Sequence, residues 1–507
     1  MTGPLFAALL LAGTQEYDAL LAEGIAAGRA GRLEEARRLL DRAVGLDPAR
    51  PEALVERGGV DFLEGRYDAA ATQLGAALER REDAYTRGLL AAALHLAGRP
   101  DDALAHWNRL GQPSLRRLTI VGLERTREDV ARREITLDEG ALVRLAGLRR
   151  SRLQLHESGA FDGVRLRTEP RAQGQADVEV ALAERSGFAR GVLDFAIATG
   201  VAAAQGRAPL RYSNLAGEGV ALAAEYRWRR NRPQASAAIS WPRPLGLGAY
   251  LTVEGFRGRQ LYEVAGQALG HRRGFELGLR RVLGPATVGG LRLRSLTRRF
   301  EGANPLARDG RVQGLEGRLD QRLVQAGRLR LSAGVSLFSA SRITGSELDF
   351  TRAMARVRTS FEAPPSSAQD TASWTLAAQV TAGIASGAPF DEGFAPGASP
   401  EMNLPLRARQ QAEDGVMGQT PLSGRLVLVN LEWRQRLWSA GGVQLGVVGF
   451  YDGARLGRVY GGHGAAIHDI GFGVRALVPG AGVLRFDLGH GLSDGRNAVS
   501  IGLGHVF

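Results

Sequence analysis

Histidine and arginine are the residues of this chain whose types and spacing could do chemistry. His463 and His468 flank a glycine-rich segment, and two nearby imidazoles could hold a metal ion. We interpret them as surface residues of a turn. The chain has no cysteine, which excludes disulfides, thiolate metal sites and cysteine nucleophiles. It also contains no Gly-x-Ser-x-Gly, His-Glu-x-x-His or Walker-type motif, so we expect neither an enzyme nor a cofactor or metal site.

The basic residues are all arginines, and the formal net charge is +12. They are scattered through the chain and are not gathered in one patch among aromatic residues, which argues against nucleic-acid binding. Arginines at strand ends could instead bind the phosphate groups of outer-membrane lipids, and arginines on an inner face could line a channel. The charge therefore favours lipids as partners and excludes nucleic acid.

The elements that must position these arginines are alternating strands. Residues 328–337 read RLRLSAGVSL, with Leu329, Val335 and Leu337 on one face and Arg328 and Arg330 on the other. Apolar-out and polar-in alternation is typical of transmembrane β-barrels. From Phe188 onward about sixteen such segments follow, and they predict a closed antiparallel barrel over residues 188–507. Inward arginines then require a water-filled lumen, because burying unpaired charge costs several kcal/mol.

The last ten residues, AVSIGLGHVF, also alternate and end on a phenylalanine carboxylate. This pattern is typical of the closing strand of a bacterial outer-membrane barrel, although an edge strand of a soluble sandwich could look similar. His505 is the one poor fit on the predicted outward face, which carries Val499, Ile501, Leu503 and Phe507.

Residues 17–113 repeat a helical pattern. Gly31-Arg32-Leu33-Glu34-Glu35-Ala36 recurs 34 residues later from Gly65 and again 33 residues later from Gly98. That period resembles tetratricopeptide repeats, which form an α-solenoid, and Leu40, Leu74 and Trp107 are expected to fill the groove between neighbouring helices. The repeats could offer a docking surface for a periplasmic or envelope partner, or they could serve as a spacer. The sequence leaves both open.

An apolar run at residues 4–13 has the length of a signal-peptide core, which predicts a signal peptide over residues 1–16. The usual basic residues before it are missing, so the first turn of a helix is the alternative. No stretch reaches about 18 uninterrupted apolar residues, so we expect no transmembrane helix.

Residues 114–187 change to a β-α-α-β-β order, with helices expected over Arg127–Ile135 and Gly140–Ser158. The module resembles a POTRA domain, the periplasmic module of the BamA/TamA family of outer-membrane assembly proteins. The matching core residues are Ile120, Gly122, Gly159, Phe161 and Val164. The resemblance implies a strand edge that can pair with an extended client, and a passive hinge is the alternative.

The barrel segment resembles the same family in its last strands. In that family a long loop folds into the lumen, and its arginine contacts acidic residues of later strands. The resemblance implies a latch formed by Arg407 with Glu432, Asp452 and Asp487. Here Ala408 replaces the family's glycine and Arg409 its aromatic residue, and a solvated loop arginine is the alternative.

The family resemblance also implies a lateral seam between the first and last barrel strands. The first strand is expected around Gly191–Ile197, which contains Phe195 and Ile197, and the last over Ala498–Phe507. Glycines would keep this pairing weak. The chain is thus expected to lie in the bacterial outer membrane, to receive client polypeptides through its periplasmic N-terminal domains, and to insert or translocate them. A dedicated two-partner-secretion translocator and a lipid-handling or structural envelope barrel are the alternatives.

Overall fold

The structure is a computed structural model that describes residues 3–185, 191–363, 373–397, 402–409, 415–418, 420–478 and 482–507. Among these, the side chains of residues 3–13, 193–194 and 325–326 are not described. The chain forms two compact units, of which the first comprises residues 1–121, 135–152 and 165–181 and the second comprises residues 122–134, 153–164 and 182–507. The predicted boundary between residues 187 and 188 lies outside the described residues.

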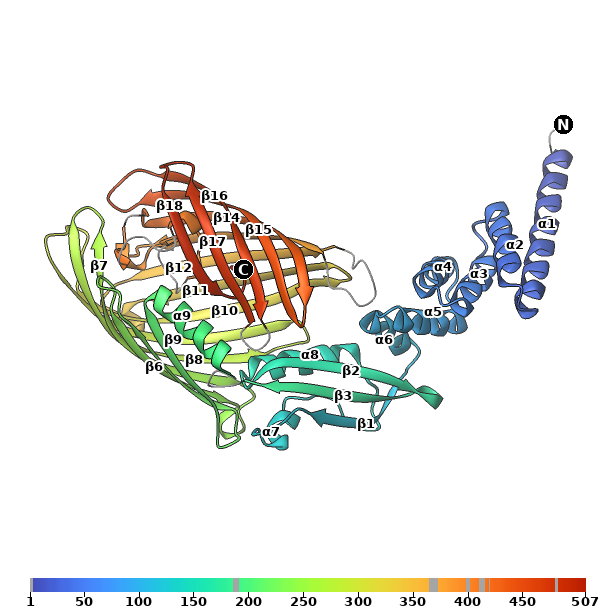
Figure 1. The fold of residues 1–507 in the computed structure, drawn as a ribbon, viewed down its shortest axis with the longest axis horizontal. Coiled ribbons are helices and arrows are strands. Elements are labelled where there is room, and N and C mark those ends of the chain that lie inside the picture. The colour runs from blue at the N-terminus through green and yellow to red at the C-terminus, as the bar shows by residue number, and fades with distance from the viewer. Residues whose placement is uncertain are drawn as a thin grey trace. The chain divides into compact units, whose positions relative to one another are not determined.

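Six helices open the first unit and pack as consecutive neighbours (Figure 1). They are α1 (Gly3–Arg29), α2 (Leu33–Leu46), α3 (Pro51–Leu63), α4 (Tyr67–Arg80), α5 (Ala84–Leu96) and α6 (Pro100–Arg109). Glycines allow paired helices to approach closely: a Cβ on Gly24 would lie 2.8 Å from the Leu40 side chain, and one on Gly58 2.7 Å from that of Leu74. Leu40 and Leu74 are fully buried, whereas Trp107 is half-buried. The tetratricopeptide assignment itself stays a prediction.

Helix α1 runs without a break through most of the segment predicted as a signal peptide, and cleavage there stays a prediction. Of the described helices, none combines the length and apolar character needed to cross a membrane.

The next segment has the expected β-α-α-β-β order: β1 (Ser114–Val121), α7 (Glu128–Arg132), α8 (Leu145–Glu157), β2 (Phe161–Arg171) and β3 (Gln175–Glu184). Its sheet order is β1-β3-β2, and β1 runs parallel to β3. Phe161 is buried, whereas Ile120 and Val164 are half-buried. Gly122 and Gly159 both have positive φ, and a Cβ on Gly122 would lie 2.1 Å from the Leu182 carbonyl oxygen. Only glycine fits there.

The second unit is dominated by a 15-stranded sheet in which sequential neighbours from β4 to β18 are hydrogen-bonded. All the pairings are antiparallel, and the sheet curls round on itself (Figure 1). The strands are β4 (Arg207–Leu215), β5 (Val220–Arg227), β6 (Gln234–Pro242), β7 (Tyr250–Glu263), β8 (Gln267–Val282), β9 (Thr287–Glu301), β10 (Gly310–Ala326), β11 (Leu329–Ala340), β12 (Phe350–Glu362), β13 (Trp374–Ser386), β14 (Ser423–Ala440), β15 (Val443–Val459), β16 (Ala465–Val478), β17 (Gly482–Gly491) and β18 (Asn497–Leu503).

The predicted closure of the barrel is not seen, because the described residues contain no ladder between β4 and β18, and the predicted count of about sixteen strands stays a prediction. The segment predicted as the first strand forms helix α9 (Val192–Gln205) instead. Its alanine-rich second half favours a helix, and Gly206 ends it in the left-handed conformation that glycine adopts without strain. We call the curled sheet the open barrel.

The segments 122–134 and 153–164 hold one end of the open barrel. The Glu134 carboxylate is buried, accepts a hydrogen bond from the Tyr250 hydroxyl at 2.7 Å, and pairs with Arg243 at 2.8 Å. The Asn214 amide donates to the Thr126 hydroxyl at 2.8 Å, which fixes the β4–β5 turn. We call this end of the sheet the module end.

The interior of the open barrel has two parts. Apolar side chains from β9 to β16 pack around Phe394, Leu404 and Leu406 of the long β13–β14 loop and form a dry core. A polar cavity of about 770 Å³ adjoins it, reaches Leu153 and Glu157 at the module end, and is lined by many arginines. The interior thus holds a polar cavity beside an apolar core packed around the loop, and the filling of that cavity by water stays a prediction.

Candidate functional site

The loop between β13 and β14 crosses the interior of the open barrel. Its first part pairs with the start of β14, where Phe394 and Ser423 form an antiparallel bridge. The Gly397 N–H donates to the Leu404 carbonyl at 2.7 Å. A short 3₁₀ turn, η5 (Arg407–Arg409), follows Leu406, and all three of its residues are buried.

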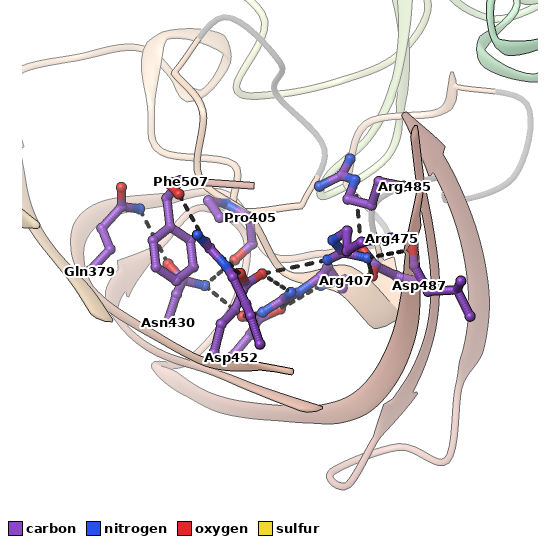
Figure 2. A network of polar contacts seen from close by, with 12 residues as sticks. Gln379, Pro405, Arg407, Asn430, Asp452, Arg475, Arg485, Asp487 and Phe507 are labelled. Carbon is purple, nitrogen blue, oxygen red and sulfur yellow. Dashed lines mark hydrogen bonds and ion pairs between the residues drawn. The ribbon is translucent and has the colours of Figure 1, made fainter. Parts of the chain in front are cut away.

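Arg407 is held by a buried cluster on β14 and β15 (Figure 2). Its Nε and Nη2 donate to the two Asp452 carboxylate oxygens at 2.8 and 2.7 Å, a bidentate contact, and its Nη1 donates to Glu432. All three side chains have no exposed surface. The Phe450 ring lies 3.5 Å from the guanidinium carbon and covers it. We call Arg407, Glu432 and Asp452 the latch cluster.

Amide side chains complete the hydrogen bonding of the latch cluster. The Asn430 amide donates to Asp452 at 2.7 Å and to the Pro405 carbonyl at 2.9 Å, and Gln379 donates to Asn430 at 3.3 Å (Figure 2). Alternation along β14 places both Asn430 and Glu432 on the inner face. A buried carboxylate is stable only when its oxygens are paired, and here every partner is fixed by a strand or by the loop backbone.

Asp487, the fourth residue predicted for the latch, does not contact Arg407 directly. It pairs with Arg475 at 2.6 Å, and Arg475 lies 3.8 Å from Glu432. The structure thus brings three of the predicted residues into direct contact and reaches the fourth through an arginine. Their role in holding the loop stays a proposal.

Arg409 and its acidic partners were missed in the sequence. Arg409 pairs with Asp494, and with Asp469 at 3.6 Å, while the Ala408 N–H donates to Asp469 at 3.1 Å. The loop backbone lies against β17 at Gly489, where a Cβ would be 2.7 Å from the Ala408 nitrogen. The inward position of Asp469 on β16 was a signal that could have revealed one partner, whereas Asp494 lies in the β17–β18 connection, where alternation gives no signal.

A second set of ion pairs holds the loop nearer its start. In this set the loop contributes the carboxylates and the strands contribute the arginines. Asp391 and Glu392 belong to the loop, on the 3₁₀ turn η4 (Phe390–Glu392). Arg298 pairs with Asp391 at 2.6 Å, and Glu392 pairs with Arg294 at 3.0 Å and with Arg352 at 3.2 Å. We call these five residues the acidic anchor. The loop is therefore tied to the wall by carboxylates at one place and by arginines at another.

The predicted seam residues are not arranged as expected. Phe195 and Ile197 lie on helix α9 and not on a strand, and Phe195 is 64% exposed. Helix α9 contacts β18, where the Gln205 amide donates to the Ile501 carbonyl at 2.9 Å. Val499, Ile501 and Leu503 do lie on β18 and are paired to β17. One edge of the predicted seam is thus β18, and helix α9 lies against it.

Phe507 does not share the outward face of β18, which corrects the prediction. The strand ends at Leu503, and Gly504 has a φ of +81°, which redirects the chain. The Phe507 carbonyl accepts a hydrogen bond from Arg434 at 3.1 Å, and its ring lies 5.7 Å from that guanidinium (Figure 2). The end of the chain therefore points to the inner face of β14, next to the latch cluster.

No protein-family profile and no curated protein sequence matches this chain. Solved structures do match: CdiB from Escherichia coli has a TM-score of 0.50 at 12% identity and covers 78% of this chain and 75% of its own. CdiB from Acinetobacter baumannii has a TM-score of 0.49 at 13% identity, over 75% and 70%. BamA from Haemophilus ducreyi lacking POTRA domains 1–3 has a TM-score of 0.43 at 14% identity, over 77% and 83%.

At these identities the likeness concerns the fold. The three-stranded module, the antiparallel sheet and the long inward loop are present in one chain, and the match to CdiB from Escherichia coli extends over most of it. The chain therefore shares the fold of CdiB from Escherichia coli, a curled antiparallel sheet preceded here by a β-α-α-β-β module.

Proposed function

We propose that this chain is an outer-membrane protein that inserts client polypeptides into the membrane or translocates them across it, with its N-terminal domains in the periplasm. The observation that carries the proposal is the buried latch cluster, which holds a long loop across the interior of the open barrel. Buried ion pairs attach the loop to the wall at Arg407 and at the acidic anchor, beside the apolar packing of Phe394, Leu404 and Leu406. Such pairs can be exchanged for water when the loop moves.

Among the described strands β18 has β17 as its one neighbour, and its other edge also supports this proposal. A free strand edge presents N–H and C=O groups that an extended client can bond. Helix α9 stands beside this edge and bonds it through one described side chain, Gln205. A client strand could displace a helix held in this way, because it would supply many more backbone hydrogen bonds.

A dedicated translocator is the second candidate function. The fold match to CdiB, a two-partner-secretion translocator, favours it. In this case the β13–β14 loop would leave the interior so that one secreted polypeptide could pass. The polar cavity lined with arginines would then form part of the path.

Site-specific crosslinking separates the two candidates. A photoreactive residue at Ile501, on the edge strand, should capture nascent barrel proteins if the chain is an insertase. A residue at Arg358, which lines the polar cavity, should capture a secreted polypeptide if the chain is a translocator. Depletion of the protein with unchanged levels of every other outer-membrane and surface protein would refute both.

The helical repeats are proposed to dock a partner or client in the periplasm. Leu40 is fully buried, so the exposed side chains Leu63, Tyr85 and Leu96 are the better contacts for a partner. A photoreactive residue at Tyr85, which is 71% exposed, tests this. Capture of a single envelope protein, with no nascent client, would favour the structural or lipid-handling alternative.

A further inference from the structure

The outer surface of β7 to β10 carries an arginine patch at the end of the sheet opposite the module end. It consists of Arg257, Arg259, His271, Arg273, Arg299 and Arg311. Strand β7 begins at Tyr250, which is bonded to Glu134, and runs away from the module end. Arg257 and Arg259 therefore lie towards the far end, and the register places the other members of the patch beside them.

The strand register arranges the patch in two rows. Arg257 is directly opposite Arg273, Arg273 is opposite Thr297, and Thr297 is opposite Arg311. In the second row His271 lies between Arg259 and Arg299. Rows two residues apart are separated by about 7 Å, and four strands span about 14 Å. The patch is thus compact enough for one ligand to touch several guanidinium groups.

Nothing in the described chain neutralises these arginines. The five arginines are exposed, and no ion pair joins any of their guanidinium groups to a described residue. The carboxylate of Glu301 pairs with His271 at 3.2 Å, and Glu347 accepts the backbone N–H of Arg311 at 3.0 Å. Like charges directly opposite each other, as in Arg257 and Arg273, destabilise a sheet unless an anion lies between them.

The surface between this patch and the module end is apolar. Val253, Leu277, Leu293 and Leu315 form one row across the same four strands. Leu251, Leu279 and Leu291 form the next row. Leu291 is 56% exposed and Leu315 47% exposed. An apolar band bordered by unpaired cations fits a molecule that has hydrocarbon chains and an anionic headgroup. A free anion could bind the cations but would make no contact with the apolar band.

We propose that the arginine patch binds the headgroup of an outer-leaflet lipid that carries at least two phosphate groups, with its acyl chains against the apolar rows. Guanidinium groups remain charged at any physiological pH and bind phosphate oxygens bidentately. The proposal rests on the proposed placement in the outer membrane, which puts this end of the sheet at the outer leaflet.

The test uses the full chain in detergent micelles, with lipid adducts counted by native mass spectrometry. Diphosphoryl lipid A is the probe, and monophosphoryl lipid A and inorganic pyrophosphate are the comparison ligands. The variant R257Q/R273Q removes the opposed pair of the patch. The matched control R425Q/R455Q removes two exposed, outward arginines that lie near each other on β14 and β15 at the same end of the sheet.

We expect R257Q/R273Q to raise the dissociation constant for diphosphoryl lipid A about tenfold, with a weaker effect on monophosphoryl lipid A. The control should keep its affinity within about twofold. An equal loss in both variants, an unchanged R257Q/R273Q, or pyrophosphate binding as tight as lipid A binding would each overturn the proposal. Gel mobility with and without heating verifies that each variant is folded.

Failure of this inference and failure of the proposed function can be told apart. If the unaltered protein fractionates with the outer membrane and supports client insertion but shows no preference for lipid A, only the lipid site is refuted. If it binds lipid A in micelles but never reaches the outer membrane, the proposed function fails while the binding chemistry stands.

Discussion

Arg407 shows how strongly one buried side chain can depend on its partners. Its guanidinium has no exposed surface and bonds two carboxylates that are themselves fully buried. Removing one member of such a cluster leaves an uncompensated charge, which costs more than the intact pairs contribute. The sequence resemblance selected this arginine, but its partners follow from the facing strands.

Replacing Arg407 with alanine is expected to lower the free energy of unfolding by about 3–5 kcal/mol. The loss arises because Asp452 and Glu432 would remain buried without their cation. Urea unfolding in detergent measures it. Arg425→Ala, at an exposed outward position, is the control and should change stability by under about 0.5 kcal/mol. Equal effects of the two substitutions would contradict the latch.

Glu184 provides a pH-dependent contact in the β-α-α-β-β module. Burial raises the pKa of Glu184, but N–H groups of Thr126, Arg125 and Glu124, at 2.6 to 3.0 Å, lower it more. The net pKa lies below its ordinary value. The contact therefore stabilises the folded state above the ordinary glutamate pKa of about 4.3, and this contribution is lost as the pH falls through the lowered value.

We accordingly expect amides 124–126 to be protected from hydrogen exchange at neutral pH and to lose protection on acidification. Glu184→Gln should lower their protection at neutral pH and flatten its pH dependence, because the amide has no charge to lose. Exchange measured by mass spectrometry and corrected for the intrinsic rate provides the readout. A pH profile identical in the two proteins would refute the role of the carboxylate.

At the scale of elements, the helix pairs depend on small residues facing large ones. Leu74 is fully buried and lies against Gly58, so Leu74→Ala would leave a cavity that the backbone cannot easily close. We expect a loss of about 2–5 kcal/mol in the unfolding of the helical segment. Circular dichroism at helical wavelengths and limited proteolysis provide the measurement. Leu63→Ala, at a 69% exposed position, is the control that should leave both unchanged.

The β13–β14 loop is held at its first part by the acidic anchor. D391N/E392Q would remove the two loop carboxylates that pair with Arg298, Arg294 and Arg352, while Arg294 would keep its contact with Glu276 at 3.6 Å. We expect the loop to leave the wall more often, since the buried arginines gain hydration when it does. Single-channel conductance in planar bilayers should rise and fluctuate more. Asp349→Asn, an exposed acid on the β11–β12 connection, should leave the conductance unchanged.

At the scale of the whole molecule, the open barrel has a helix where closure would need a strand. Because the chain lacks cysteine, a reducible bis-thiol crosslinker can join α9 to β18 in Q205C/I501C without background labelling. We expect this crosslink to block client insertion or transit and reduction to restore it, because α9 must leave β18 for a client strand to pair. The control L484C/L503C joins β17 to β18 within the sheet and should leave activity intact.

Full activity of the crosslinked Q205C/I501C protein would show that the β18 edge is not the route of the client. Passage of the client through the interior of the open barrel would then be the remaining candidate route. Inactivity of both crosslinked proteins would point to a general need for movement in the last strands, and would remove α9 from the mechanism.

Side-chain periodicity predicted most of the elements and their order, with the exception of α9, because it reports which faces are apolar. The alternation in residues 328–337, the repeat at Gly31 and Gly65, and the β-α-α-β-β order all appear in the elements of the structure. The resemblance of residues around Arg407 was enough to select a buried loop arginine. These features are local, so a window of a few residues contains them.

The contacts between distant segments, in contrast, depend on how the whole chain folds. The acidic anchor joins Asp391 to Arg298, 93 positions apart, and no local pattern connects them. The strand expected around Phe195 is a helix because alanine-rich continuation and Gly206 outweigh its short alternation. Phe507 turns inward because Gly504 permits a φ that a strand excludes. Register and long-range pairing arise from the packing of the whole sheet, which no single segment encodes.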